Sequence, residues 1–179
     1  MFLVRHGQSF FNAAFNLTRI DPGIPDPALT ALGRRQAIEA GDALAAHGIR
    51  RLLASPYTRT LETASIIAER LGLAIEIEPL VRERAAFHCD IGSGRDALAE
   101  RWPALRFDHL DDPWWHDHVG SGIAESEAQL ETRARAFHAR MAAEDARERV
   151  AVVTHWGFIR ALTGKPVTNG EIVRIEWPG

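Results

Sequence analysis

Two short apolar runs, each ending in a histidine close to a glycine, constrain the fold of this chain most strongly. Residues 1–5 are Met-Phe-Leu-Val-Arg and lead directly into His6. Residues 150–154 are Val-Ala-Val-Val-Thr and lead into His155 in the same way. Short apolar runs are typical of buried strands, and open α/β proteins bind ligands at the carboxyl ends of their strands. We therefore expect His6 and His155 to lie together at one edge of one sheet.

Strand and helix patterns alternate along the chain. Strands are predicted at residues 2–4, 51–54, 74–77, 150–153 and 172–177. Helices are predicted from Thr30 to Gly48 (with Leu32, Ala37, Ile38 and Leu44 inward), over residues 59–71, from a Ser126 capping box to about Ala146, and over residues 158–163. Residues 12–27 resemble a loop after a short helical start at residues 10–16, and residues 79–118 are the least regular part. The alternation predicts α/β layers around a mainly parallel sheet.

Length, charge and cysteine content narrow the class of protein. The 179 residues suffice for one domain, which we assign to residues 1–179. The net charge of −3 argues against a nucleic-acid or membrane-surface partner, and no apolar stretch has the length of a bilayer span. Cys89 is the only cysteine and the start of the chain lacks a basic signal segment. A reducing, cytoplasmic location is expected.

The Arg5-His6-Gly7 turn has the residue types that bind and accept a phosphoryl group. The arginine offers a planar fork of donors that suits phosphate oxygens, and a neutral imidazole is a competent nucleophile. Gly7 would let a substrate approach closely. The simpler alternative is a strand that ends in a surface arginine and a hydrogen-bonded histidine. For the tripeptide alone, the two interpretations have about equal weight.

Two further polar residues fit an anion site. Arg59 lies near a predicted helix start, where the helix dipole disfavours a cation unless an anion is bound beside it. The alternative for Arg59 is a solvated residue of the first helical turn. Asn12 follows the first histidine closely and, taken alone, is better explained as a cap or turn residue.

Four segments in a consistent order resemble the histidine phosphatase superfamily, the phosphoglycerate-mutase-like family. They are Arg5-His6-Gly7-Gln8-Ser9 with Asn12; Asp26-Pro27-Ala28-Leu29-Thr30 with Gly33 and Gln36-Ala37; Ser55-Pro56 with Arg59, Thr60 and Glu62-Thr63-Ala64; and Val153-Thr154-His155-Trp156-Gly157. Together they span nearly the whole chain. The resemblance implies a three-layer α/β/α sandwich with a mainly parallel central sheet and one antiparallel strand, the last one.

The resemblance also implies a role for each matching residue. His6 would be the nucleophile that becomes phosphohistidine. Arg5, Arg59 and His155 would bind the phosphate, with a hydrogen bond from Asn12. Because phosphoryl transfer depends on positioning and charge neutralisation, these side chains would suffice, and neither a metal nor a cofactor is expected.

The proton for the leaving oxygen would come from an acidic residue after the third strand. Leu80-Val81-Arg82-Glu83 matches that pattern of the family, so Glu83 is the candidate general acid. A bound phosphate dianion favours the protonated form of a neighbouring carboxyl. The alternative is a surface glutamate paired with Arg82 or Arg84. Asp90 and Glu125 are reserve candidates.

The segment after Glu83 departs from the glycolytic mutases. It lacks their Arg-His-Tyr-Gly continuation, and residues 122–126 only loosely resemble their Gly-Glu-Ser element. We therefore predict a phosphatase that hydrolyses a small phosphorylated substrate. A phosphomutase, or a phosphate-binding protein without catalytic activity, remains the alternative, and the sequence indicates neither the substrate nor the oligomeric state.

Residues 113–118, Pro-Trp-Trp-His-Asp-His, permit two further hypotheses. Trp114 and Trp115 could form an apolar wall of the pocket, or they could simply pack the irregular segment against the core. His116 and His118, with Asp112 and Asp90, could also be metal ligands. Because their spacing matches no known metal motif, this second hypothesis has little weight.

Overall fold

The computed structural model describes residues 1–177 and contains a five-stranded sheet in the order β3-β2-β4-β1-β5. The strands are β1 (Phe2–Arg5), β2 (Arg51–Ala54), β3 (Ile75–Ile77), β4 (Val150–Thr154) and β5 (Ile172–Arg174). Three neighbouring pairs are parallel, and only β5 runs antiparallel, beside β1. The prediction of a mainly parallel sheet with an antiparallel last strand is confirmed.

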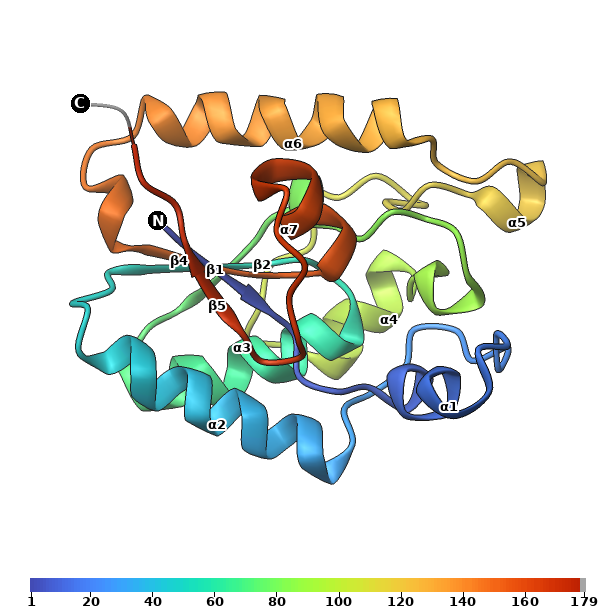
Figure 1. Cartoon of the computed structure of the whole chain (residues 1–179), viewed down its shortest axis with the longest axis horizontal. Helices are drawn as coiled ribbons and strands as arrows, with labels where there is room; N and C mark the ends of the chain where they lie inside the picture. The colour runs from blue at the N-terminus through green and yellow to red at the C-terminus, as the bar shows by residue number, and fades with distance from the viewer. Residues whose placement is uncertain (178–179) are drawn as a thin grey trace.

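Helices cover both faces of this sheet, which gives three layers (Figure 1). The helices are α1 (Phe10–Thr18), α2 (Ala31–Ala45), α3 (Thr58–Leu71), α4 (Arg95–Arg101), α5 (His118–Ser121), α6 (Glu127–Ala142) and α7 (Trp156–Thr163), with single 3₁₀ turns at Pro79–Val81, His88–Asp90 and Arg147–Arg149. Alternate residues of β1 point to opposite faces. Phe2 and Val4 join the core under α2 and α3, whereas Leu3 joins the core under α6 and α7.

The starts of α2 and α6 lie where they are predicted, and so do the ends of α3 at Leu71 and of α7 at Thr163, whereas α7 begins at Trp156, two residues before its predicted start. Thr30 caps α2 by accepting a hydrogen bond from the Gly33 backbone, and Ser126 forms the predicted capping box of α6. In contrast, α2 ends at Ala45 and α6 at Ala142, earlier than predicted. Side-chain caps and a glycine stop such as Gly72 leave a local sequence signal, whereas a helix end without such a residue is less sharply defined.

Two other details of the helix predictions are wrong. Leu32 and Ile38 of α2 remain 39% and 38% exposed, because the face of α2 that packs on the sheet contains small residues instead. The predicted loop over residues 12–27 begins later, because α1 continues to Thr18. A reciprocal capping box between Ser9 and Asn12 stabilises the start of that helix.

The two histidines that follow the central strands β1 and β4 lie at one edge of the sheet. His6 follows β1 and His155 follows β4, which are hydrogen-bonded neighbours. The backbone N–H of His6 donates to the Thr154 carbonyl at 3.0 Å. At Gly7 a side chain would collide with the Gly33 backbone, so only glycine lets α2 approach this turn. No helix within residues 1–177 is long and apolar enough to cross a membrane.

Candidate active site

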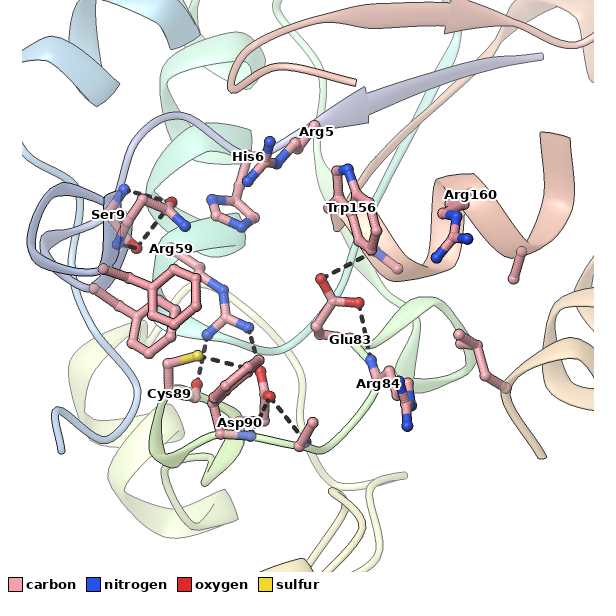
Figure 2. Close-up of a pocket in the computed structure, with 18 of the residues that line it drawn as sticks. Arg5, His6, Ser9, Arg59, Glu83, Arg84, Cys89, Asp90, Trp156 and Arg160 are labelled. Atoms are coloured by element: carbon pink, nitrogen blue, oxygen red, sulfur yellow. Dashed lines mark hydrogen bonds and ion pairs between the residues drawn. The ribbon is translucent and has the colours of Figure 1, made fainter. Parts of the chain in front are cut away.

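A cavity of about 850 Å³ opens at the edge of the sheet where β1 and β4 end. Five of the six predicted site residues line it, namely Arg5, His6, Asn12, Arg59 and Glu83. Figure 2 shows the Arg59 guanidinium between the His6 ring and the Cys89–Asp90 segment, with Glu83 on the side of Trp156. His155 is fully buried behind His6 and does not belong to the lining.

The hydrogen bonding of His6 leaves one ring nitrogen available. Its Nδ1 lies 2.7 Å from the Gly7 carbonyl oxygen. Because a carbonyl only accepts, we assign the proton to Nδ1, and Nε2 then holds a free lone pair. Burial lowers the pKa of His6 well below its usual value, and the charges of Arg59 and Arg5 lower it further. The ring is therefore neutral near pH 7, the form that a nucleophile requires.

His155 contacts His6 edge to face, with 5.2 Å between the ring centroids. The expectation that the two imidazoles meet at one sheet edge is confirmed. The Nε2 atom of His155 is 2.8 Å from Ser55 Oγ, while its Nδ1 is buried without a partner within residues 1–177. Burial and then Arg59 lower the pKa of His155. A bound anion beside these rings would offset that effect and favour a second cation.

Arg59 is held in place by two groups of the irregular segment. Its Nη1 donates to the Cys89 carbonyl at 2.7 Å, and its Nη2 contacts Asp90 Oδ1 at 3.1 Å. The guanidinium also lies 4.3 Å from the centre of the Tyr57 ring. Arg59 is thus a buried, oriented cation and not a solvated residue of the first helical turn.

Arg5 provides a second guanidinium at the carboxyl end of β1. Its Nη1 donates to the Val167 carbonyl at 2.8 Å, and its Nε is buried without a partner within residues 1–177. A buried, unpartnered donor is costly. An anion bound in the cavity would satisfy it, so Arg5 and Arg59 together suit a phosphate group.

Glu83 differs from the two reserve acids in what surrounds its carboxyl. Among residues 1–177, its oxygens accept hydrogen bonds only from backbone N–H groups, those of Arg84 at 2.9 Å and Gly157 at 3.1 Å. Burial raises its pKa above the usual value, and the Asp90 carboxylate raises it further. The side chain lines the cavity, and the alternative of a surface ion pair is wrong.

The other two carboxyl groups are engaged elsewhere. Asp90 lines the cavity, but one oxygen pairs with Arg59 and the other accepts from the backbone N–H groups of Ala86 and Phe87, each at 3.1 Å. Glu125 lies outside the cavity lining and forms a buried ion pair with Arg133 at 2.7 Å. Each is therefore a structural anion.

Asn12 has both of the roles weighed for it at the sequence level. Its Oδ1 accepts from the Ser9 backbone at 3.0 Å, which completes the cap of α1, and from Asn169 at 3.1 Å. The side chain also lines the cavity. Because Oδ1 is the accepting atom, Nδ2 is the part that could donate to an anion.

The Trp114–Trp115 wall is a wrong hypothesis, because both rings lie outside the cavity lining. Trp114 is buried and packs on Tyr57 with 4.6 Å between centroids, and Tyr57 in turn meets His155 at 5.2 Å. The Tyr57 hydroxyl donates to the Asp90 carbonyl at 2.7 Å. Tyr57 therefore supports both Arg59 and His155, a role that no local pattern indicated.

The metal-ligand hypothesis for residues 112–118 also lacks support. Within the described residues, no three His, Cys, Asp or Glu side chains form a group that could hold a metal ion. His118 instead lies with its Nε2 at 2.9 Å from the Phe87 carbonyl. This contact packs the segment against the end of the cavity.

A neutral histidine lies in the cavity beside two guanidinium groups and a carboxyl of raised pKa. This set can bind a phosphoryl group, accept it and supply a proton to the leaving oxygen, so the class that the site defines is an enzyme of phosphoryl transfer. A family model of the histidine phosphatase superfamily (branch 1) matches residues 1–171. The chain belongs to this superfamily, as the four sequence segments predicted.

Relatives of known sequence include both phosphatases and mutases. A glucosyl-3-phosphoglycerate phosphatase of Mycolicibacterium vanbaalenii is 29% identical over 184 residues, which cover 96% of this chain and 77% of the relative. The probable phosphoglycerate mutase GpmB of Erwinia tasmaniensis is 39% identical over 83 residues, which cover 46% of this chain and 37% of the relative. The similarity to the phosphatase therefore extends over nearly the whole chain, whereas the similarity to the mutase is confined to a part.

Solved structures share the fold. The mycobacterial glucosyl-3-phosphoglycerate phosphatase in complex with VO3 has a TM-score of 0.64 at 23% identity, covering 96% of this chain and 88% of that chain. A putative alpha-ribazole-5'-P phosphatase from Escherichia coli has a TM-score of 0.61 at 20% identity, covering 90% and 75%. The mixed sheet and its helical layers are thus those of this superfamily.

Proposed function

We propose that this phosphatase works through a phosphohistidine at His6. The Nε2 lone pair of His6 forms a bond to phosphorus while the bond from phosphorus to the ester oxygen breaks, and that oxygen takes the proton of Glu83. The Glu83 carboxylate then takes a proton from water, and the water oxygen attacks phosphorus. The P–N bond breaks, its electron pair returns to Nε2, and inorganic phosphate leaves.

The cations around His6 support the transfer step. Arg5 and Arg59 would bind the phosphoryl oxygens, with Asn12 donating a hydrogen bond and His155 supplying charge once an anion is present. Fixed donors of this kind stabilise the spread-out charge of the transition state. The observation that carries the proposal is the 2.7 Å contact of His6 Nδ1 with the Gly7 carbonyl. It leaves Nε2 without a hydrogen-bond partner among residues 1–177, beside two buried or half-buried guanidinium groups.

We favour hydrolysis over phosphoryl return to a second hydroxyl. The full-length similarity is to a phosphatase, and the departure after Glu83 lies where the glycolytic mutases have a characteristic motif. The substrate is proposed to be a small phosphorylated metabolite in the cytoplasm. Glucosyl-3-phosphoglycerate, the substrate in the relative's name, is the first compound to assay.

Trapping of the phosphoenzyme tests this proposal. The wild-type protein, mixed briefly with a ³²P-labelled monoester and quenched in alkali, should carry label that is lost in acid, as expected for phosphohistidine. His6→Ala should carry none and should retain less than about a tenth of the wild-type turnover, because the covalent route is gone. His47→Ala, which changes a histidine outside the cavity, is the control. Label that survives in His6→Ala would overturn the assignment.

A further inference from the structure

The cavity is larger than a phosphate group requires. Its volume of about 850 Å³ lies in the upper part of the range of pockets that enclose drug-sized ligands. The proposed phosphate-binding groups gather at the inner end, around His6 and Arg59. The outer part of the cavity is therefore available to the organic part of a substrate.

One wall of this outer part consists of three phenylalanine rings, Phe11, Phe15 and Phe87, which we call the aromatic platform. The Phe11 and Phe15 rings stack with 5.3 Å between centroids and 12° between planes. Phe87 packs against both, at 5.6 Å and 5.4 Å. All three line the cavity, but Phe11 is only 6% exposed, so the open aromatic surface belongs to the half-buried Phe15 and to Phe87, which is 40% exposed. Aromatic surface left open to water in a pocket is stabilised when an apolar ligand covers it.

The opposite wall is polar and carries charges of both signs. It includes Arg84, Arg160 and Glu127, and Arg84 pairs with Glu127 at 3.0 Å. The Arg160 guanidinium lies 5.2 Å from the Trp156 ring. Figure 2 places Arg84 and Arg160 on the far side of Glu83 from Ser9, the cap of the helix that carries Phe11 and Phe15. The two walls differ, so a ligand has a preferred orientation.

The aromatic platform is attached to the catalytic end of the cavity. The backbone N–H of Phe87 donates to Asp90, whose other oxygen pairs with Arg59. Phe11 and Phe15 belong to α1, which starts at Phe10, four residues after His6. The platform thus has a fixed position relative to the phosphate-binding groups.

Resting on the proposed phosphatase function, we propose that the aromatic platform binds a flat unsaturated ring, and that the substrates of this enzyme are phosphomonoesters that carry such a ring. Ring-to-ring contacts are worth about 0.5–1.5 kcal/mol beyond the area that they bury. A small organic group would leave the platform exposed to water, and a saturated apolar group would cover it without gaining the ring-to-ring contacts.

Binding of non-hydrolysable phosphonates tests this inference independently of turnover. We expect 1-naphthylmethylphosphonate to bind the wild-type protein at least about tenfold more tightly than methylphosphonate, measured by calorimetry. Phe15→Ala and Phe87→Ala should each weaken the naphthyl ligand about tenfold and change the affinity for methylphosphonate less than about twofold. Phe10→Ala is the matched control, since Phe10 lies on the same helix, 54% exposed and outside the cavity lining.

Other outcomes would overturn the inference. Equal affinity for the two phosphonates, or equal losses for both ligands in the platform variants, would show that the platform does not bind the ring. A loss of the same size in Phe10→Ala would show a general effect of the helix. Failure of the proposed hydrolysis would appear separately, as absence of phosphate release from monoesters that still bind.

Discussion

At the scale of single residues, Glu83 is either the general acid or a residue that only shapes the cavity, and an experiment can separate the two roles. If it is the general acid, Glu83→Gln should lower kcat/KM about 10²–10⁴-fold on an alkyl phosphate and much less on 4-nitrophenyl phosphate, whose leaving group needs no proton. Because burial raises the Glu83 pKa, the acid form persists to higher pH than for an ordinary glutamate. Activity on the alkyl ester should fall as pH rises through that pKa, and Glu83→Gln should lose this alkaline limb. Equal losses on the two substrates would mean that Glu83 only shapes the cavity.

Asp90 is a second residue whose effect follows from its contacts. It forms the buried ion pair with Arg59, and removing the charge of one partner leaves the other without compensation. Asp90→Asn should therefore lower the free energy of unfolding by about 3 kcal/mol, measured by urea denaturation. Asp96→Asn changes a side chain that is 98% exposed and should stay within about 0.5 kcal/mol of wild type. Similar values for the two variants would contradict a structural role for the Asp90 charge.

At the scale of elements, the start of α7 positions the candidate acid. A side chain at Gly157 would collide with Glu83 Oε1, whereas one at Gly94 would meet only Asp112 Oδ1 at 3.9 Å. Gly157→Ala should displace the carboxyl and cost about 10²-fold in kcat on an alkyl phosphate, because small misplacements of catalytic groups are expensive. Gly94→Ala, the matched glycine at the start of α4, should leave kcat near wild type. A fully active Gly157→Ala enzyme would show that the Glu83 position is not critical.

At the scale of the whole molecule, the permanent positive charge at the site comes from two arginines on different elements, Arg5 of β1 and Arg59 of α3. Arg5 and Arg59 are permanently charged, so phosphate can be neutralised without a metal ion. We expect the rate of phosphate release to be unchanged after prolonged dialysis against EDTA. Loss of activity on chelation, with recovery on addition of Zn²⁺ or Mn²⁺, would contradict this prediction.

The same scale shows which features a sequence reveals. The strands that carry His6 and His155 have local apolar patterns, so their positions and their meeting at one edge were predictable. The supports of Arg59 were not, because Tyr57 and Asp90 reach it through contacts that exist only after the irregular segment has packed. The hypothesis that Trp114 and Trp115 form a wall of the cavity is wrong for the same reason, because the burial of Trp114 beside Tyr57 depends on tertiary structure. The extent of the single domain, residues 1–179, stays a prediction.

The hydrogen bonds of Asp90 also bear on how this enzyme could change its substrate. The Asp90 carboxylate pairs with Arg59 of the reaction centre and also accepts hydrogen bonds from the backbone of Ala86 and Phe87, four and three residues earlier in the chain. Because these bonds use backbone atoms, the side chains at positions 86–88 could change during evolution while Asp90 keeps its contacts. Substitutions in this segment could therefore change the substrate preference while the groups of the reaction centre keep their positions.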